Sequence, residues 1–156
     1  MKIKFKKLND KAIIPEYKTE GAAGFDINVL LDKDSEILKK GEVKLFKTGL
    51  AIALPDGYEA QVRSRSGLSL KNGVIVLNAP GTIDSDYRGE IGIIMTNCGQ
   101  EDFVVENGSR IAQIVIAKYE KAEIEVVEDL DETERGADGF GSTGIKNDNK
   151  LWKNYL

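Results

Sequence analysis

Short runs of alternating apolar and polar residues, or of β-branched residues, recur along most of the chain. This pattern is typical of strands that are buried on one face. Turn sequences such as Pro55-Asp56-Gly57 and Asn72-Gly73 separate the runs, because Pro fixes φ and Gly accepts positive φ. The predicted strands are Lys2–Lys7, Phe25–Leu30, Val43–Phe46, Leu50–Leu54, Tyr58–Arg63, Val74–Asn78, Glu90–Thr96, Ile111–Tyr119 and Ile124–Glu128.

A single short stretch, Ser66–Lys71, has the pattern of a helical turn. Many short strands with regular turn signals indicate a β-sandwich or β-barrel rather than a mixed fold. The strand pattern stops near Asp131, and the sequence contains no internal repeat. We therefore expect one all-β domain over residues 1–130, with one short helix, followed by a flexible, Gly-rich C-terminal arm over residues 131–156.

The composition limits the classes of partner that the chain is expected to bind. The chain has 156 residues, a net charge of −4 and a pI near 5.0, which argues against nucleic acid because such interfaces are strongly basic. No apolar run approaches the roughly 18 residues that a membrane span needs. The basic N-terminus lacks the apolar stretch of a signal peptide. We expect a cytoplasmic protein with neither a nucleic-acid nor a membrane partner.

The chain contains no histidine and one cysteine, Cys98. An imidazole base, an intramolecular disulfide and a His- or Cys-rich zinc site are therefore excluded. Any general base should be Asp or Glu, and any metal should be a hard cation such as Mg²⁺, bound through oxygen. Cys98 is expected to lie in an apolar strand as a small core residue.

The segment from Glu134 to Gly144 reads E-R-G-A-D-G-F-G-S-T-G. Its glycines allow a close backbone approach, its Arg135, Ser142 and Thr143 suit phosphate oxygens, and Phe140 offers a face for a base. The Rossmann interpretation fails because no helix pattern follows, and no P-loop sequence is present. The segment predicts a flap for a nucleotide; alone, it would equally fit a linker.

Two further clusters carry candidate chemistry. The segment N-A-P-G-T-I-D-S-D-Y-R-G lies between two apolar strands and predicts a protruding hairpin, in which Asp84 could orient a water as a general base. Arg65, Ser66 and Gly67 open the helical turn, where anions bind well. Taken alone, Asp84 could be an ordinary turn acid, and Ser66 a helix cap beside solvated arginines.

Two positions on other predicted strands also need an explanation. Arg110 and Gln113 flank a strand start, where a structural salt bridge is the simpler interpretation of the arginine. Asp26 lies inside an apolar strand, which is a costly place for an unpaired carboxylate. Asp26 therefore needs a partner or a role.

Together these segments resemble, in the right order, the five motifs of the homotrimeric dUTP pyrophosphatases. The matching stretches are A-A-G-F-D-I, R-S-G-L-S, G-T-I-D-S-D-Y-R-G, G-S-R-I-A-Q and R-G-A-D-G-F-G-S-T-G, from about residue 22 to residue 144. Five ordered motifs are far more specific than any one of them. The resemblance implies a jelly-roll-like β-clip fold, and a homotrimer whose three active sites are shared among subunits.

The resemblance also implies Mg²⁺-dependent hydrolysis of dUTP to dUMP and pyrophosphate, which limits uracil in DNA and supplies dUMP for thymidylate synthesis. It makes Asp84 the general base, with Gln113 and Arg135 as the other catalytic residues, and Asp26 a possible outer-shell metal residue. Tyr87 would pack on the deoxyribose and reject a 2′-hydroxyl. The implied substrate-binding residues are Arg65, Ser66, Gly67, Asn78, Thr82, Ile83, Asp84, Tyr87, Gly92, Arg135, Phe140, Gly141, Ser142 and Thr143.

Two alternatives stay open. A dCTP deaminase resembles this fold, but that family carries a glutamate base in the corresponding hairpin, where this chain reads D-S-D-Y-R-G. A trimeric nucleotide-binding regulator that contacts a protein partner is the second alternative. The terminal segment Ile145–Leu156 extends beyond the last motif, and the resemblance gives it no role.

Overall fold

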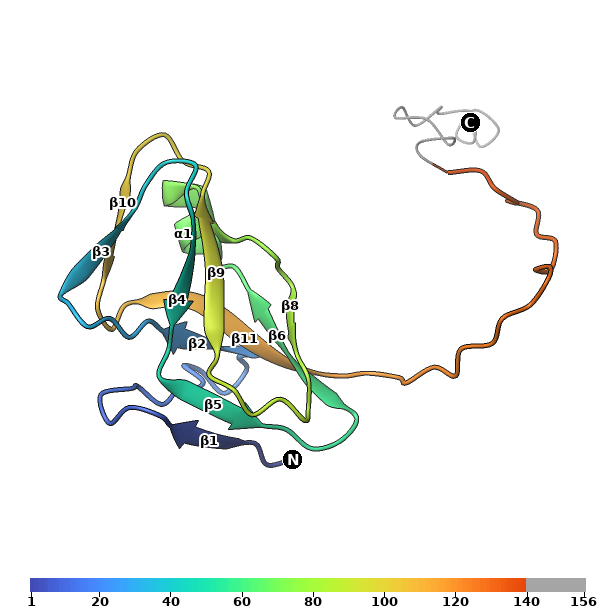
Figure 1. Cartoon of the computed structure of the whole chain (residues 1–156), viewed down its shortest axis with the longest axis horizontal. Helices are drawn as coiled ribbons and strands as arrows, with labels where there is room; N and C mark the ends of the chain where they lie inside the picture. The colour runs from blue at the N-terminus through green and yellow to red at the C-terminus, as the bar shows by residue number, and fades with distance from the viewer. Residues whose placement is uncertain (140–156) are drawn as a thin grey trace, which may run out of the picture. The chain divides into compact units, whose positions relative to one another are not determined.

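The structure, a computed structural model, describes residues 1–139. The chain divides into a compact unit, Met1–Lys121, and a second unit that begins at Ala122. All regular elements of the described residues lie in the first unit (Figure 1). They are β1 (Lys4–Lys7), β2 (Gly24–Asn28), β3 (Ser35–Leu38), β4 (Val43–Lys47), β5 (Leu50–Ala53), β6 (Tyr58–Arg63), α1 (Ser66–Asn72), β7 (Val74–Val76), β8 (Gly81–Ile83), β9 (Gly92–Asn97), β10 (Phe103–Glu106) and β11 (Arg110–Lys118).

The strands form antiparallel sheets with the orders β2-β11-β6-β8, β4-β9-β7, β1-β5 and β10-β3. Alternate residues of the two larger sheets point into one shared core, as Ile27 and Ile114 do from the first sheet, and Phe46 and Ile93 from the second. A core enclosed between sheets is the arrangement of a β-sandwich. The all-β prediction with one short helix is confirmed, and the sheets remain separate instead of closing into a barrel.

Most predicted strands are present within a few residues of their expected bounds, and the predicted helical turn is α1. The pattern missed the three short strands β3, β8 and β10. The predicted strand Ile124–Glu128 is wrong for the single chain, where Ile124 and Val126 are 90% and 94% exposed. A strand needs a paired edge, and this segment has none among the described residues. The expectation for Cys98 is also wrong, since it is exposed and lies beyond the end of β9.

Two glycines fix the end of α1. Gly73 ends the helix in the left-handed conformation, with φ of 68°, and its N–H donates to Ser69 O at 3.1 Å. A Cβ on Gly73 would lie 2.6 Å from the backbone N and Cα of Gly99, and a Cβ on Gly99 would overlap the carbonyl oxygen of Asn72. The Cys98 N–H donates to Gly73 O at 2.9 Å. The end of α1 is therefore packed directly against the turn that follows β9.

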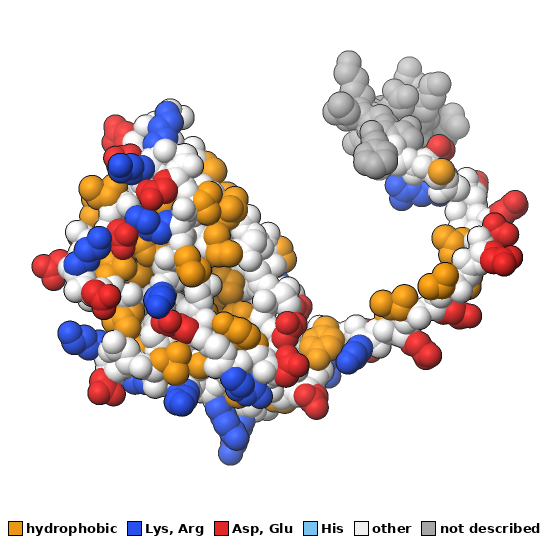
Figure 2. Space-filling view, in the orientation of Figure 1, with side chains coloured by type: hydrophobic (Ala, Val, Ile, Leu, Met, Phe, Trp, Pro, Cys, Tyr) orange, Lys and Arg blue, Asp and Glu red, His pale blue; other side chains and the backbone are white. Residues whose placement is uncertain are grey.

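The outward face of the β4-β9-β7 sheet is apolar. Val43 and Leu45 of β4 are 54% and 59% exposed, and Leu45 is opposite Ile94 in the strand register. Figure 2 shows hydrophobic side chains gathered over β4 and β9. An apolar patch of this kind commonly marks a contact surface. Separately, no helix within residues 1–139 has the length and the apolar character needed to cross a bilayer.

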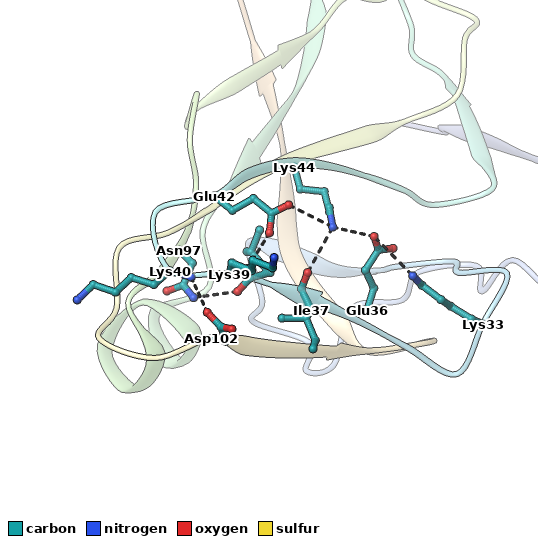
Figure 3. A network of polar contacts seen from close by, with 10 residues as sticks. Lys33, Glu36, Ile37, Lys39, Lys40, Glu42, Lys44, Asn97 and Asp102 are labelled. Carbon is teal, nitrogen blue, oxygen red and sulfur yellow. Dashed lines mark hydrogen bonds and ion pairs between the residues drawn. The ribbon is translucent and has the colours of Figure 1, made fainter.

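Charged residues of β3, β4 and the turn between them form a network around Lys44 (Figure 3). Lys44 Nζ donates to Glu36 Oε1 at 2.8 Å and lies 3.3 Å from Glu42 Oε1. Glu42 Oε2 also accepts from the Lys39 N–H at 2.7 Å. The hydrogen bond from Lys44 lowers the pKa of Glu36 below its usual value of 4.5, and the bond from the Lys39 N–H, followed by Lys44, lowers the pKa of Glu42. Glu36, followed by Glu42, raises the pKa of Lys44.

These shifts predict how the network responds to pH. Carboxylates with a lowered folded pKa stabilise the fold above the unfolded pKa, and that contribution disappears as pH falls through the folded value. In Lys44→Met the lysine that lowers these pKa values is absent. The melting temperature of this variant should therefore fall less than that of wild type between pH 6 and pH 3. The effect should be small, because exposed ion pairs contribute little. Melting temperatures across that range test this, with the exposed Lys11→Met as control; parallel curves for wild type and Lys44→Met would contradict the prediction.

Candidate active site

A pocket of about 200 Å³ forms where β8 ends and β9 begins. Pairing of β8 with β6 fixes one wall, since Ile83 is opposite Ala60 and Gly81 is opposite Val62. Ile83 is buried, whereas the Asp84 side chain that follows it is exposed. The residues that line the pocket are Thr82, Ile83, Asp84, Tyr87, Glu90, Ile91 and Gly92. Five of these seven are predicted substrate-binding residues, and the structure brings them together.

Tyr87 is held within this pocket by its own loop. Its backbone N–H donates to Asp84 O at 3.2 Å, and its hydroxyl donates to Glu90 O at 3.0 Å. The side chain is 45% exposed, so the ring is both positioned and accessible. A Cβ on Gly89 would overlap the Tyr87 ring, so the ring lies directly against the backbone of residue 89. The arrangement presents an aromatic wall close to a carboxylate.

Asn78 is also predicted for this end of the substrate, but it lies beside the pocket and does not line it. A Cβ on Gly81 would be 3.1 Å from Asn78 Nδ2, so the Asn78 amide packs over the start of β8. Asn78 is exposed in the single chain. The structure therefore places it next to β8, and its contact with a base remains a prediction.

A second group of predicted residues surrounds Asp26. Arg65 Nε lies 3.0 Å from Asp26 Oδ1, and Arg110 Nη1 lies 2.9 Å from Asp26 Oδ2. Arg65 Nη1 also donates to Arg110 O at 2.8 Å. Asp26 thus has the partners that its place in an apolar strand requires, and Arg110 forms the salt bridge expected of it. Arg65 and Arg110 both line a pocket of about 600 Å³.

Ser66 and Gly67 begin α1 and are exposed. The residue that caps the helix is Arg65, with no side-chain hydrogen bond to the helix, so the interpretation of Ser66 as a capping residue is wrong. A Cβ on Gly67 would meet nothing within 4 Å, which leaves open space in front of the first turn. The first-turn N–H groups of a helix have no intrahelical acceptor. Arg65 and this turn together offer donors to an anion.

Gln113 of β11 lies between β2 and β6, the two strands that pair with β11. In the β11 register it is opposite both Asp26 of β2 and Arg63 of β6. Its Nε2 donates to Ser64 O at 2.9 Å, directly before Arg65. This bond holds the chain that leads into α1. A contact of Gln113 with water or phosphate remains a prediction.

Within the first unit, these residues form two groups rather than one site. The pocket at Asp84 and the pocket at Arg65 share no lining residue. Arg135 belongs to the second unit, where its Nε donates to Asp138 O at 2.9 Å. Phe140, Gly141, Ser142 and Thr143 lie outside the described residues. Glu90 lines the pocket, although the sequence motifs did not single it out. Its position three residues after Tyr87 is the feature of the sequence that could have indicated it.

The described residues contain no group of three or more His, Cys, Asp and Glu side chains that could hold a metal ion. Both oxygens of Asp26 face guanidinium groups, so this carboxylate is not arranged as a direct metal ligand. Mg²⁺ commonly keeps several waters and binds through one or two carboxylates and the substrate's phosphates. The residues present fit that mode, in which the nucleotide supplies most of the ligands.

Comparison with known proteins places these observations in a family. The dUTPase family model matches residues 10–144. The deoxyuridine 5′-triphosphate nucleotidohydrolase of Rickettsia felis is 54% identical over 144 residues, which cover 92% of this chain and 97% of the relative. The corresponding protein of Orientia tsutsugamushi (strain Boryong) is 56% identical over 149 residues, 94% of this chain and 100% of the relative.

Solved structures agree. A mutant dUTPase of Staphylococcus bacteriophage 80alpha with dUpNHpp superposes with a TM-score of 0.82 at 28% identity, and covers 92% of this chain and 99% of its own. A mutant dUTPase from phage phi11 of S. aureus, whose structure reveals the coordination of a structural Mg(II) ion, has a TM-score of 0.74 at 25% identity, with 85% and 100% covered. The chain belongs to the dUTPase family.

Proposed function

We propose that this chain hydrolyses dUTP to dUMP and pyrophosphate in the cytoplasm, with Mg²⁺, as a homotrimer with shared active sites. The observation that carries the proposal is the pocket at the end of β8, where a base recognition edge, the Asp84 carboxylate and the Tyr87 ring adjoin one another. A dUTP hydrolase must also bind the triphosphate, and Arg65 with the first turn of α1 supplies donors for it. Membership of the dUTPase family ties both groups to one substrate.

Uracil recognition fits the position of β8. This strand is last in the order β2-β11-β6-β8, so one of its backbone edges has no paired strand among residues 1–139. Such an edge presents N–H and C=O groups in a row. Uracil offers a matching set, two carbonyl acceptors and an N–H donor between them. We assign uracil to Thr82, Ile83 and Gly92, with Asn78 supporting the start of the strand.

Asp84 is assigned as the general base. It follows buried Ile83 on a fixed strand, while its carboxylate is exposed to the pocket where an attacking water would lie. The chain has no histidine that could take this role. Proton transfer from the water to Asp84 accompanies attack on the phosphorus next to the sugar, and pyrophosphate leaves. Positioned bases typically contribute about 10²–10⁴-fold.

The triphosphate is assigned to Arg65, Ser66, Gly67 and Gln113, with Arg135, Gly141, Ser142 and Thr143 of the arm closing over it and Phe140 covering the base. An acidic protein needs local cations for such a ligand, and the Arg65 group provides them. Mg²⁺ bound to the phosphates supplies further charge neutralisation. Arg65 and the first turn of α1 orient the phosphates, which keeps the scissile bond in line with the water.

Two observations support a trimer. The residues assigned to base and sugar and those assigned to the phosphates line separate pockets in one chain, so a complete site requires a second subunit. The outward face of the β4-β9-β7 sheet is apolar at Val43 and Leu45, as expected of a surface that another copy covers. Asp26 is assigned to the residues that bind the phosphates, where its carboxylate holds Arg65 in position. We also assign it to the outer coordination shell of Mg²⁺.

Replacing Tyr87 with Ala should lower the dUTP/UTP ratio of kcat/KM. The ring forms the wall on the sugar side of the pocket, and steric exclusion of a 2′-hydroxyl disappears when the ring is removed. We expect the ratio to fall by roughly tenfold or more, since steric clashes of this kind cost more than about 1.4 kcal/mol. Steady-state kinetics on both nucleotides measures it. An unchanged ratio would place discrimination elsewhere.

A product assay with dUTP, dCTP, dTTP and UTP tests the function itself. Pyrophosphate should form from dUTP and not appreciably from the other three. Ammonia release from dCTP would instead support the deaminase alternative. Binding of dUTP without turnover, in a protein that retains a partner in pull-down experiments, would support the regulator alternative. Either result would overturn the proposed reaction.

A further inference from the structure

We infer that Glu90 is the positioning residue for Tyr87, because its carboxylate fastens the sugar-side wall of the pocket to the turn between β4 and β5. The inference rests on the proposed function, in which Tyr87 meets the deoxyribose. Glu90 lies three residues after Tyr87 and lines the same pocket. Its backbone and its side chain each make contacts that none of the assigned roles uses.

The backbone of Glu90 holds the tyrosine. The Tyr87 hydroxyl donates to the carbonyl oxygen of Glu90 at 3.0 Å, and this is the hydrogen bond that the structure gives to the phenol. The ring is otherwise half exposed and lies against the backbone of Gly89, so this hydrogen bond is what fixes its outer end. Where the ring lies therefore depends on where the peptide after Glu90 lies. A displaced carbonyl would release the hydroxyl and allow the ring to rotate away from the sugar.

The side chain of Glu90 provides one of the contacts that hold this part of the chain. Glu90 Oε1 accepts from the Gly49 N–H at 2.9 Å, and Glu90 Oε2 lies 3.8 Å from Lys47 Nζ. The ammonium of Lys47 is well exposed, so the longer contact contributes little. The Gly49 bond is different because it is part-buried and uses a charged acceptor, and such bonds are the stronger ones.

The turn that receives Glu90 is itself rigid. Gly49 has φ of 67°, and a Cβ there would lie 2.6 Å from Leu30 Cδ2, so its backbone is tightly enclosed. Buried Thr48 donates from Oγ1 to Ile91 O at 2.8 Å. The Ile91 N–H donates to Leu50 O at 2.7 Å. Residues 90 and 91 are therefore attached at three points to a turn that cannot easily move.

This arrangement separates the hydrogen-bonding role of Glu90 from its charge. Glu90→Gln keeps an acceptor oxygen for the Gly49 N–H and should preserve the position of Tyr87. Glu90→Ala removes the acceptor and leaves a part-buried N–H without a partner. Glu90→Asp keeps the charge but shortens the side chain, and gives the same test if the alanine variant does not fold. Glu101→Ala is the matched control, because it removes the same charge from an exposed loop.

Steady-state kinetics with dUTP and UTP tests the inference. Glu90→Ala and Glu90→Asp should lower the dUTP/UTP ratio of kcat/KM by roughly tenfold, the value of one lost hydrogen bond. The main change should be a raised KM for dUTP, because Asp84 stays in place. Glu90→Gln and Glu101→Ala should stay within about twofold of wild type. The double variant Tyr87→Phe/Glu90→Ala should lower the dUTP/UTP ratio of kcat/KM no further than the more severe single variant does. Each substitution disrupts the same link between Tyr87 and Glu90, so their effects should not add.

An unchanged ratio in Glu90→Ala and Glu90→Asp, or an equal loss in Glu90→Gln, would overturn the inference. A measurement independent of activity separates it from the proposed function. Hydrogen exchange of the peptide that covers residues 84–91 should be faster in Glu90→Ala than in wild type, and equal to wild type in Glu90→Gln. If wild type fails to hydrolyse dUTP but this exchange difference appears, the proposed reaction fails and the anchoring by Glu90 stands. Equal hydrogen-exchange rates for this peptide in wild type and all variants would show that Glu90 does not anchor Tyr87.

Discussion

Asp84→Asn should lower kcat for dUTP by roughly 10²–10⁴-fold while the fold and substrate binding are largely retained. The amide fills the same space, and the exposed position of Asp84 means that no buried contact is lost. No histidine is available as a substitute base. The effect should therefore appear in the chemical step and leave KM nearly unchanged.

Asp86→Asn is the matched control, because Asp86 is an exposed acid two positions further along the same loop. It should keep turnover close to that of wild type. Calorimetric titration with a non-hydrolysable dUTP analogue should give similar affinities for wild type and both variants. Near-normal turnover in Asp84→Asn would show that another group activates the water.

Truncation after Thr133 should abolish most turnover, by roughly 10²-fold or more, and leave the melting temperature nearly unchanged. The first unit ends at Lys121 and contains every strand that the structure describes, so the core does not depend on the removed residues. The removed segment carries Arg135, Phe140, Ser142 and Thr143, which are assigned to both ends of the substrate. Loss of these residues removes phosphate contacts and the exclusion of water together.

Mixing the truncated chain with Asp84→Asn chains tests whether sites are shared. Each chain alone should have little activity, and co-expression with two different tags allows mixed trimers to be purified. Activity should recover, since some sites in a mixed trimer combine an intact Asp84 with an intact arm from another subunit. If mixed trimers form and no activity returns, arm and base belong to the same subunit.

The local parts of the site were predictable from the sequence. Thr82, Asp84 and Tyr87 lie within six residues of one another, so a single turn between strands is enough to bring them to one pocket. The ion pairs of Asp26 were predictable only as a requirement, because an acid inside an apolar strand needs a partner. Which arginines meet it depends on the pairing of β2 with β11, and a sequence pattern does not specify that pairing.

The rest depended on contacts between distant segments. Strands β3, β8 and β10 have three or four residues each, too few for an alternating pattern to be distinctive. The role of Glu90 requires the β4–β5 turn to lie beside residue 90, which only the fold establishes. The sequence of Ile124–Glu128 predicts a strand, but a strand requires a neighbouring edge as well as a suitable sequence.

The contact between Gly73 and Gly99 constrains how this sequence can evolve. In most tight contacts a larger residue on one side can be compensated by a smaller residue on the other. Here both residues are already glycine, and the atom nearest to a new Cβ at either position belongs to the backbone. No second-site substitution can therefore restore the space, and every path through a side chain at either position requires the backbone to separate. Because α1 presents Arg65 and Ser66 at its other end, that separation would also displace the phosphate-binding group. We expect homologous lineages to keep both glycines even where the surrounding loop drifts freely.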